Sequence, residues 1–322
     1  MHTAIDTLKD KRVLVTGADG FLGSALSTAL VAQGAKVVAG VGPRKHISRL
    51  AHIEKDITVI ANDLTNAGDA MKIVADSAPD ILFHAAAVVS KDRDPAHLDA
   101  IVSYNYSMAR NIMTAAVEHE VSHAVHVGTI EEYGAIPAPF RESDRACPIS
   151  PYALGKLLAT EHALYMGKTT RMRVNVVRPA AFFGPGQGFG SLIPNIVKAA
   201  FAGEDFEMNK GEQLRDFVYI DDVIEGLVRV ARSDLTGEIM NLGSSSPVTI
   251  KNVAEMTNAA MGSPIVIRFG AQPYRPLDPM SAFLESTKAR EKLGWEPRIS
   301  IAEGIKKTVE WYRAHYKDMP QT

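Results

Sequence analysis

A strand, a glycine-rich turn and a helix follow one another near the N-terminus, and this unit restricts the fold more than any other stretch. Arg12–Thr16 is an apolar run typical of a buried strand, the turn Gly17-Ala18-Asp19-Gly20-Phe21-Leu22-Gly23 comes next, and a helical pattern then runs to Gln33, before Gly34. The glycines let the backbone turn tightly and approach a pyrophosphate, while the helix N-terminus offers N–H donors and the positive end of its dipole. The unit therefore predicts a dinucleotide-binding turn.

Strands and helices alternate from this unit as far as Arg178. The expected strands include Lys36–Val41, Thr58–Ala61, Ile81–His84 and Val125–Gly128. Such alternation predicts an α/β fold, here a Rossmann-like doubly wound parallel sheet followed by a smaller, mixed α/β C-terminal lobe. Ligands bind at the carboxyl ends of the strands in such sheets, so Gly17–Gly23, His84–Ala87 and Thr129 should lie along one edge.

A second informative stretch is Ser150-Pro151-Tyr152-Ala153-Leu154-Gly155-Lys156. Ser150 can cap a helix and Pro151 fits its first turn. Tyr152 and Lys156 are then four residues apart and share a helix face. We expect the ammonium to favour phenolate and to move the tyrosine pKa from about 10 towards neutral. This tyrosine could exchange a proton with a sugar or alcohol oxygen while hydride moves on the adjacent carbon.

Taken in order, these features resemble the short-chain dehydrogenase/reductase family, specifically its extended branch, the NAD-dependent epimerase/dehydratase family acting on nucleotide-sugars. The resemblance covers the chain from Lys11 to Tyr312. Besides the glycine turn and the Tyr-x-x-x-Lys pair, the matching stretches are Asn62-Asp63-Leu64, His84-Ala85-Ala86-Ala87, Asn105, Thr129–Gly134, Arg178-Pro179, Gly184-Pro185-Gly186, Arg215–Asp222 and Lys288–Trp295.

The resemblance implies roles for individual residues. Thr129 and Tyr152 would hold and protonate the reacting sugar oxygen, and Lys156 would also bind the nicotinamide ribose. The implied cofactor-binding residues are Gly17, Gly20, Phe21, Leu22, Gly23, Asp63, Leu64, Ala85 and Ala86, with Asp63 at the adenine. The alternative for Asp63 is that it caps the following turn, and the alternative for Thr129 is that its hydroxyl forms a hydrogen bond with the backbone. We expect His84 to be a hydrogen-bonded core histidine.

The end of the second strand bears on the choice of cofactor. An acid that binds the ribose is expected there, but the strand ends in Gly42-Pro43-Arg44-Lys45. Arg44 and Lys45 could pair with the 2′-phosphate of NADP, or they could be solvated loop charges. The sequence favours NADP(H) and leaves NAD(H) open.

Two adjacent glutamates follow Thr129. In the 4,6-dehydratases of this family, a Thr-x-Glu tripeptide supplies a glutamate base, which would be Glu131 here. The intervening residue is Ile130, which cannot donate a proton. The run therefore looks closer to the Gly-Ser-x-Glu-Glu-Tyr-Gly stretch of NDP-4-keto-6-deoxyhexose reductases. One glutamate would face substrate while the other is solvated or paired with an arginine, and the sequence does not say which.

Three functions follow from these patterns. The first is NADPH-dependent reduction of an NDP-4-keto-6-deoxy sugar at C4, with Tyr152 as acid. The second is a nucleotide-sugar 4-epimerase or 4,6-dehydratase that keeps NAD tightly bound. The third is a non-catalytic NADP-sensing scaffold, which intact Thr129, Tyr152 and Lys156 disfavour.

The second half of the chain is predicted to bind the nucleotide-sugar. Residues 181–220 and 244–322 would form this lobe, whereas 1–180 and the returning segment 221–243 would form the dinucleotide-binding domain. Arg215 and Arg275 match arginines that clamp the pyrophosphate in the family, and the alternative is a surface charge for each. Ala181 stands where many relatives carry an asparagine near the substrate phosphate.

Composition limits the remaining choices. The chain has 322 residues, is 46% apolar and carries a formal charge of -2, which suits a large core and argues against a nucleic-acid surface. No apolar run reaches about 18 residues, so no membrane span is expected. The single cysteine, Cys147, fits a reducing, cytoplasmic compartment, and no metal site is predicted. Helices around Pro95–His119 and Pro151–Met166 would form a homodimer through a four-helix bundle, burying Leu157 and Leu158.

Overall fold

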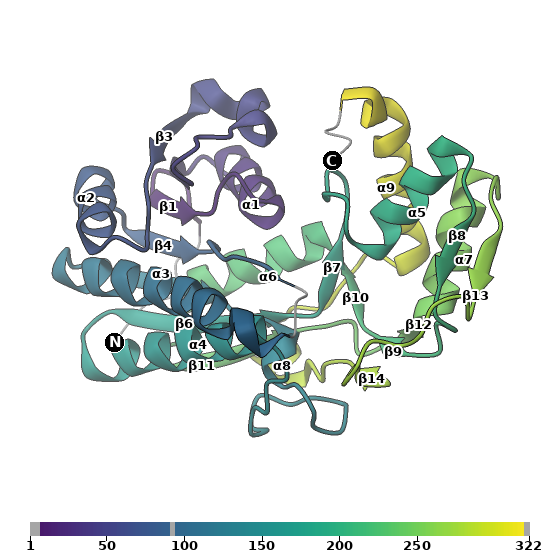
Figure 1. Ribbon diagram of the computed structural model, residues 1–322. Coiled ribbons are helices and arrows are strands. Elements are labelled where there is room, and N and C mark those ends of the chain that lie inside the picture. Colours follow the sequence, from purple (N-terminus) through teal and green to yellow (C-terminus); the bar gives the residue numbers. More distant parts are fainter. Residues whose placement is uncertain (1–6, 91–93, 319–322) are drawn as a thin grey trace.

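A computed structural model describes residues 7–90 and 94–318, and its centre is a seven-stranded parallel sheet (Figure 1). The strand order is β11-β6-β5-β4-β1-β2-β3, the doubly wound order with one added edge strand. These strands are β1 (Arg12–Thr16), β2 (Lys36–Val41), β3 (Ile57–Ala61), β4 (Ile81–His84), β5 (His123–Val127), β6 (Arg173–Pro179) and β11 (Glu238–Leu242). The predicted fold class is therefore confirmed, and the predicted strands lie within one or two residues of the observed ones.

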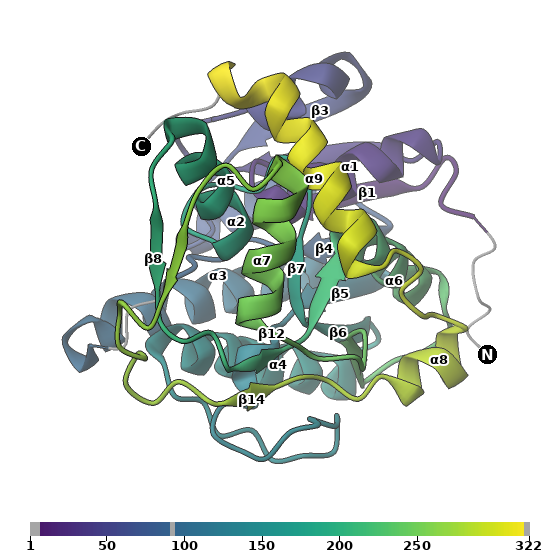
Figure 2. The same cartoon turned by 90° about the vertical axis from the view of Figure 1, so that its right-hand side faces the viewer.

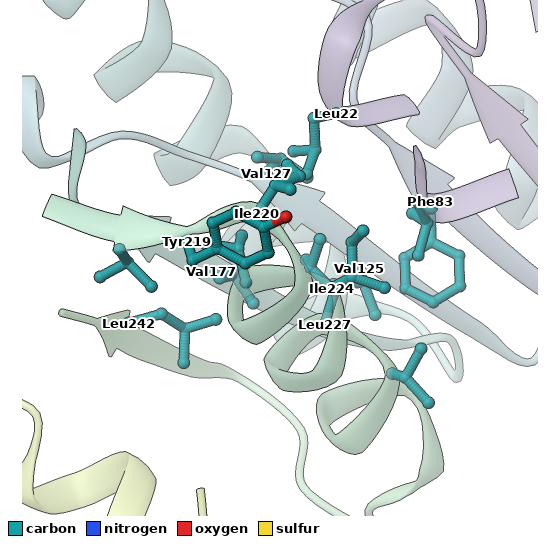
Figure 3. Close-up of a cluster of buried hydrophobic side chains, with 14 of the residues drawn as sticks. Leu22, Phe83, Val125, Val127, Val177, Tyr219, Ile220, Ile224, Leu227 and Leu242 are labelled. Atoms are coloured by element: carbon teal, nitrogen blue, oxygen red, sulfur yellow. The ribbon is translucent and has the colours of Figure 1, made fainter. Parts of the chain in front are cut away.

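Alternation along the strands separates two cores, one on each face of the sheet. Val13 and Val15 of β1 face one core and Leu14 faces the other, because successive side chains of a strand point to opposite faces. Figure 3 shows part of the first core, where Leu22, Phe83 and Val125 lie around the helix that carries Ile224 and Leu227. Burial on both faces fixes the register of the sheet and thus the position of its carboxyl edge.

Helices cover both faces. The helices of the first part of the chain are α1 (Phe21–Ala32), α2 (Ala67–Ser77), α3 (Leu98–Glu118), α4 (Pro151–Thr169) and α6 (Ile220–Arg232), with short 3-10 segments η1 (Ser48–Asp56), η2 (Pro95–His97) and η3 (Ile130–Glu132). Helix α3 packs against α2 and α4, whereas α1 packs against α6. The Ser150 side chain caps α4 as predicted, since its Oγ accepts from the Ala153 N–H at 3.1 Å.

The second lobe combines helices with short ladders. It contains β7 (Ala181–Phe183), α5 (Leu192–Ala202), β8 (Phe206–Met208), β9 (Leu214–Arg215), β10 (Phe217–Tyr219), β12 (Val248–Thr249), α7 (Ile250–Met261), β13 (Ile267–Phe269), β14 (Ser281–Ala282), α8 (Thr287–Leu293), α9 (Ile301–His315) and η4 (Tyr316–Asp318). Figure 2 shows α7 beside α9, which are in contact. Within the segment 203–213, Phe206–Met208 forms β8 because it pairs with the distant β13.

The chain returns to the main sheet after entering the second lobe. Helix α6 packs on α1, and β11 pairs in parallel with β6. Asp222 lies in the first turn of α6 but does not cap it: Tyr219 occupies the N-cap, and the Asp222 carboxylate accepts from the N–H groups of Arg298 and Ile299 at 3.0 and 3.1 Å. The domain boundaries at 180, 220 and 243 stay predictions. Within residues 7–90 and 94–318, no helix is long and apolar enough to cross a membrane.

Candidate active site

The glycine turn lies at the carboxyl edge of β1, between β2 and β4. Gly17 has φ +68°, and a Cβ placed on it would meet the Ala86 Cα at 2.7 Å. A Cβ on Gly23 would lie 2.1 Å from the Gly17 carbonyl oxygen, which leaves no room for a side chain. Both positions therefore require glycine, one for its backbone conformation and both for close packing.

A pocket opens directly above this turn. Gly20 is the N-cap of α1 and no side chain caps that helix end, so its first N–H groups are available to an anion. The pocket is lined by Gly17, Asp19, Gly20, Gly40, Val41, Gly42, Pro43, Asn62, Asp63, Leu64, Ala85, Ala86, Ala87, Val88 and Met108. Small side chains and a helix N-terminus fit the pyrophosphate and adenosine of a dinucleotide. The pocket contains six of the predicted cofactor residues: Gly17, Gly20, Asp63, Leu64, Ala85 and Ala86.

Asp63 and His84 have structural contacts of their own. The Asp63 Oδ1 accepts from the Thr65 N–H and hydroxyl at 3.0 and 2.6 Å, so this residue caps the following turn while it also lines the pocket. His84 is buried, its Nδ1 lies 2.8 Å from the Thr16 hydroxyl, and burial lowers its pKa to about 3. His84 is thus a neutral, hydrogen-bonded core histidine, as expected.

Five predicted cofactor residues are not among those that line this pocket: Phe21, Leu22, Gly23, Arg44 and Lys156. The Phe21 ring stacks on Phe182 of the second lobe at 5.9 Å, and the Leu22 side chain lies in the hydrophobic core (Figure 3). A dinucleotide contact by either residue would therefore use backbone atoms. Arg44 is exposed in the turn after β2 and is not part of the pocket wall.

Thr129, Tyr152 and Lys156 come together at the end of β5. Thr129 is the N-cap of η3, and its hydroxyl accepts from the Glu131 N–H at 3.3 Å. Tyr152 and Lys156 lie on the buried face of α4, with side chains 8% and 3% exposed. Gly155 between them packs on α3, where an added Cβ would lie 3.1 Å from the Val102 Cα. The tight α3–α4 packing therefore fixes both side chains.

The predicted effect of Lys156 on Tyr152 is corrected by the structure. Burial, with smaller contributions from Glu131 and Glu132, raises the pKa of Tyr152, and the Thr129 side chain opposes this rise. Burial lowers the pKa of Lys156 to about 8, although Glu132 acts in the opposite direction. Desolvation of the phenolate is thus the largest influence on the pKa of Tyr152. Tyr152 is therefore protonated near pH 7, which suits a proton donor.

The structure distinguishes the two adjacent glutamates. Glu132 is fully buried, and its carboxylate accepts from Arg178 Nε at 2.8 Å, from the Thr129 N–H at 2.9 Å and from the Thr160 hydroxyl at 3.1 Å. The Arg178 guanidinium also lies over the Tyr133 ring at 4.6 Å. Glu131 instead is exposed and lines a second pocket. Glu132 is thus paired with an arginine, as was expected for one of the two glutamates.

This second pocket lies between the two lobes. It is lined by Ser90, Ile130, Glu131, Gly134, Phe140, Ile149, Ser150, Ala181, Arg215, Asp216, Arg275, Asp278, Pro279 and Ala282. Arg215 and Arg275 therefore meet in one cavity with Glu131. Sequence reasoning missed Asp278, whose carboxylate accepts from Arg215 Nη2 at 2.9 Å and from Gln213 Nε2 at 3.1 Å. Only its position in Pro273–Pro279, the proline-rich loop that also holds Arg275, hinted at a role.

Comparison with known proteins agrees with this geometry. Residues 13–243 match the NAD dependent epimerase/dehydratase family, and the chain belongs to this family, within the extended short-chain dehydrogenases/reductases. It is 31% identical to the UDP-glucose 4-epimerase of Mycolicibacterium smegmatis over 94% of this chain and 98% of the relative. It is 30% identical to a Streptomyces dTDP-4-dehydro-6-deoxy-D-allose reductase, over 96% and 98%.

A solved structure of a nucleotide-sugar enzyme has the same fold as this chain. DesIV, a dTDP-glucose 4,6-dehydratase from Streptomyces venezuelae solved with NAD and TYD bound, superposes with a TM-score of 0.85 at 26% identity. The superposition covers 95% of this chain and 98% of that one. The relatives thus include epimerases, dehydratases and reductases of nucleotide-sugars.

Proposed function

We propose that this protein reduces the C4 ketone of an NDP-4-keto-6-deoxy sugar. A bound nicotinamide dinucleotide would supply the hydride to C4. Tyr152 would donate its hydroxyl proton to the oxygen that becomes the C4 hydroxyl, while the Thr129 hydroxyl positions that oxygen. Water would then return a proton to the Tyr152 phenolate, and the nearby Lys156 ammonium would stabilise that phenolate.

The observation that carries this proposal is the composition of the sugar end of the second pocket. Ile130 lies beside Glu131 in its wall, so an apolar side chain occupies the place where a 4,6-dehydratase would carry an acid. Elimination of water across C5 and C6 needs both a base and an acid, and Ile130, between Thr129 and Glu131, cannot act as that acid. A single protonated Tyr152 is sufficient for reduction of one carbonyl.

The nucleotide diphosphate would bind at the opposite side of this pocket. Arg215 and Arg275 provide planar, permanently charged groups that match phosphate oxygens. The Asp278 carboxylate holds Arg215 in place at 2.9 Å. The predicted preference for NADP(H) rests on Arg44 and Lys45, which are exposed in the turn after β2.

The second candidate is a 4-epimerase, and the Mycolicibacterium smegmatis relative favours it. Such an enzyme needs no acid at position 130, because it withdraws hydride and returns it to the other face of the same carbon. It would keep NAD bound through the cycle. Glu131 in the pocket wall gives weaker support to a 4,6-dehydratase.

The first experiment is to identify the nucleotide that acid releases from freshly purified protein. An empty protein that oxidises NADH or NADPH in the presence of one NDP-4-keto-6-deoxy sugar, followed at 340 nm, supports the reductase. Stoichiometric NAD, with no net oxidation and with interconversion of C4 epimers, rejects the reductase in favour of the epimerase.

We also propose a cytoplasmic homodimer. The outer surface of α3 and α4 exposes four large apolar side chains: Leu98, Tyr104, Leu158 and Tyr165. A contact between two copies through these helices would cover them. A monomeric mass in light scattering at micromolar concentration would reject this assembly.

A further inference from the structure

The structure places a carboxylate at the end of β2, where an acid that binds the ribose is expected. This carboxylate belongs to another segment of the chain and not to β2 itself. Asp19, from the glycine turn, points to this position: its Oδ2 accepts from the Gly42 N–H at 3.3 Å. The turn is tied to β2 a second time, because the Ala18 N–H donates to the Gly40 carbonyl at 3.1 Å. Asp19 and Gly42 both line the nucleotide pocket.

The charges around this pocket are unequal. The charged side chains in its wall are two acids, Asp19 and Asp63, whereas Arg44 is exposed outside the wall. Arg49 of η1 interacts with Asp19, and its guanidinium is half-buried and donates to the Gly186 carbonyl of the second lobe. The wall therefore favours a neutral hydroxyl over a phosphate at the end of β2.

We propose that Asp19 is the residue that selects NAD(H) over NADP(H). Its carboxylate would accept a hydrogen bond from the 2′-hydroxyl of the adenosine ribose, the role usually given to an acid at the end of the second strand. A 2′-phosphate would meet the same carboxylate as a like charge. The inference rests on the proposed function only in requiring a nicotinamide dinucleotide in this pocket, and it reverses the preference that Arg44 suggested.

Position 42 allows a test in which the carboxylate is moved from Asp19 to the end of β2. Its φ is not in the left-handed region, and a Cβ placed on it would lie 3.6 Å from Asp19 Oδ2, an ordinary contact. A side chain at position 42 is therefore tolerated and would start beside the Asp19 carboxylate. The acid can be moved from the glycine turn to the end of β2 in the double variant Asp19→Asn with Gly42→Asp.

The experiment measures equilibrium binding of NADH and NADPH by calorimetry in the absence of sugar nucleotide. Any nucleotide retained on purification is identified first, and retained NADP overturns the proposal. The full-length protein should bind NADH at least about tenfold more tightly than NADPH, and Asp19→Asn should reduce this ratio to below about threefold. The double variant should restore the preference for NADH.

Two matched variants separate this role from a general loss of binding. Asp63→Asn lies in the same pocket at the adenine end, so it should weaken both dinucleotides equally. Arg44→Gln should leave the NADH to NADPH ratio within about twofold, since Arg44 is solvated. The proposal is overturned if the unaltered protein prefers NADPH, if Asp19→Asn leaves the ratio unchanged, or if Arg44→Gln alone abolishes NADPH binding. Because no sugar takes part, these outcomes do not depend on whether the enzyme reduces or epimerises.

Discussion

The nucleotide pocket and the sugar pocket place their functional side chains in different ways. The nucleotide pocket is formed by turns that directly follow β1, β2, β3 and β4, strands held in register by parallel pairing. The residues that line the sugar pocket include a 3-10 turn, a two-residue strand and a proline-rich loop. One of its arginines, Arg215, is held by Asp278, which lies 63 residues further along the chain. The first depends on backbone geometry, and the second depends on contacts between side chains.

The largest effect is expected at Tyr152, which is buried and interacts with the Thr129 side chain. Tyr152→Phe removes the only proton donor assigned to the reaction and should lower turnover by about 10³-fold, while calorimetric binding of dinucleotide and sugar nucleotide changes little. Tyr165→Phe, on the exposed side of the same helix, is the control. Retained turnover in Tyr152→Phe would reject Tyr152 as the proton donor, whereas absence of turnover in the unaltered protein together with unchanged function of Tyr152→Phe in cells would favour a non-catalytic role.

The adjacent glutamates offer the sharpest comparison between the regions. Glu132→Gln leaves the buried Arg178 guanidinium without a counter-charge and should lower the free energy of unfolding by about 3 kcal/mol. Glu131→Gln, one residue away and exposed, should change it by less than about 0.5 kcal/mol. Urea unfolding of the two variants and of the unaltered protein measures both changes. Equal losses of unfolding free energy in the two variants would mean that buried Glu132 does not stabilise the fold more than exposed Glu131.

The arginines of the sugar pocket should act on substrate binding and not on the fold. Arg215→Lys loses the planar guanidinium and its bond to Asp278, and the dissociation constant for the sugar nucleotide should rise about tenfold. Arg268→Lys is a matched control, because Arg268 forms an exposed pair with Asp205 at 2.7 Å outside both pockets. An effect of similar size in both variants would show that the change is not specific to the pocket.

Lys156 provides a smaller effect with a defined pH dependence. Its pKa in the folded chain is about 8, below the ordinary 10.5, so the unfolded state binds more protons between these values and the stability of the protein rises with pH there. Lys156→Met removes the burial cost and should stabilise the protein by about 1–2 kcal/mol at pH 7, with the gain shrinking from pH 8 to 10.5.

Two observations would contradict this view of Lys156. One is a stability gain in Lys156→Met that stays constant from pH 7 to pH 10.5. The other is the same pH-dependent gain in Lys168→Met, which changes an exposed lysine near the end of the same helix. Urea unfolding at several pH values measures both.

Local patterns were sufficient for the sheet, the glycine turn and the helix starts. Hydrophobic alternation predicts strands, and an N-cap is set by residues three positions apart, as the bond between Ser150 and Ala153 shows. The ordered motifs also predict which strand ends meet, because a doubly wound sheet brings them to one edge. The short strand β8 was missed, because its pairing with β13 depends on residues about 60 positions away.

The sequence by itself thus determined the family, the fold and the group of residues at the sheet edge. Tertiary structure alone decided which glutamate faces the pocket, that Tyr152 is kept protonated by burial, and that Asp19 reaches the end of β2. The physical reason is that burial and charge pairing arise between segments distant in the chain. Glu132 meets Arg178 across 46 residues and Asp19 meets Gly42 across 23, and no local pattern records such contacts.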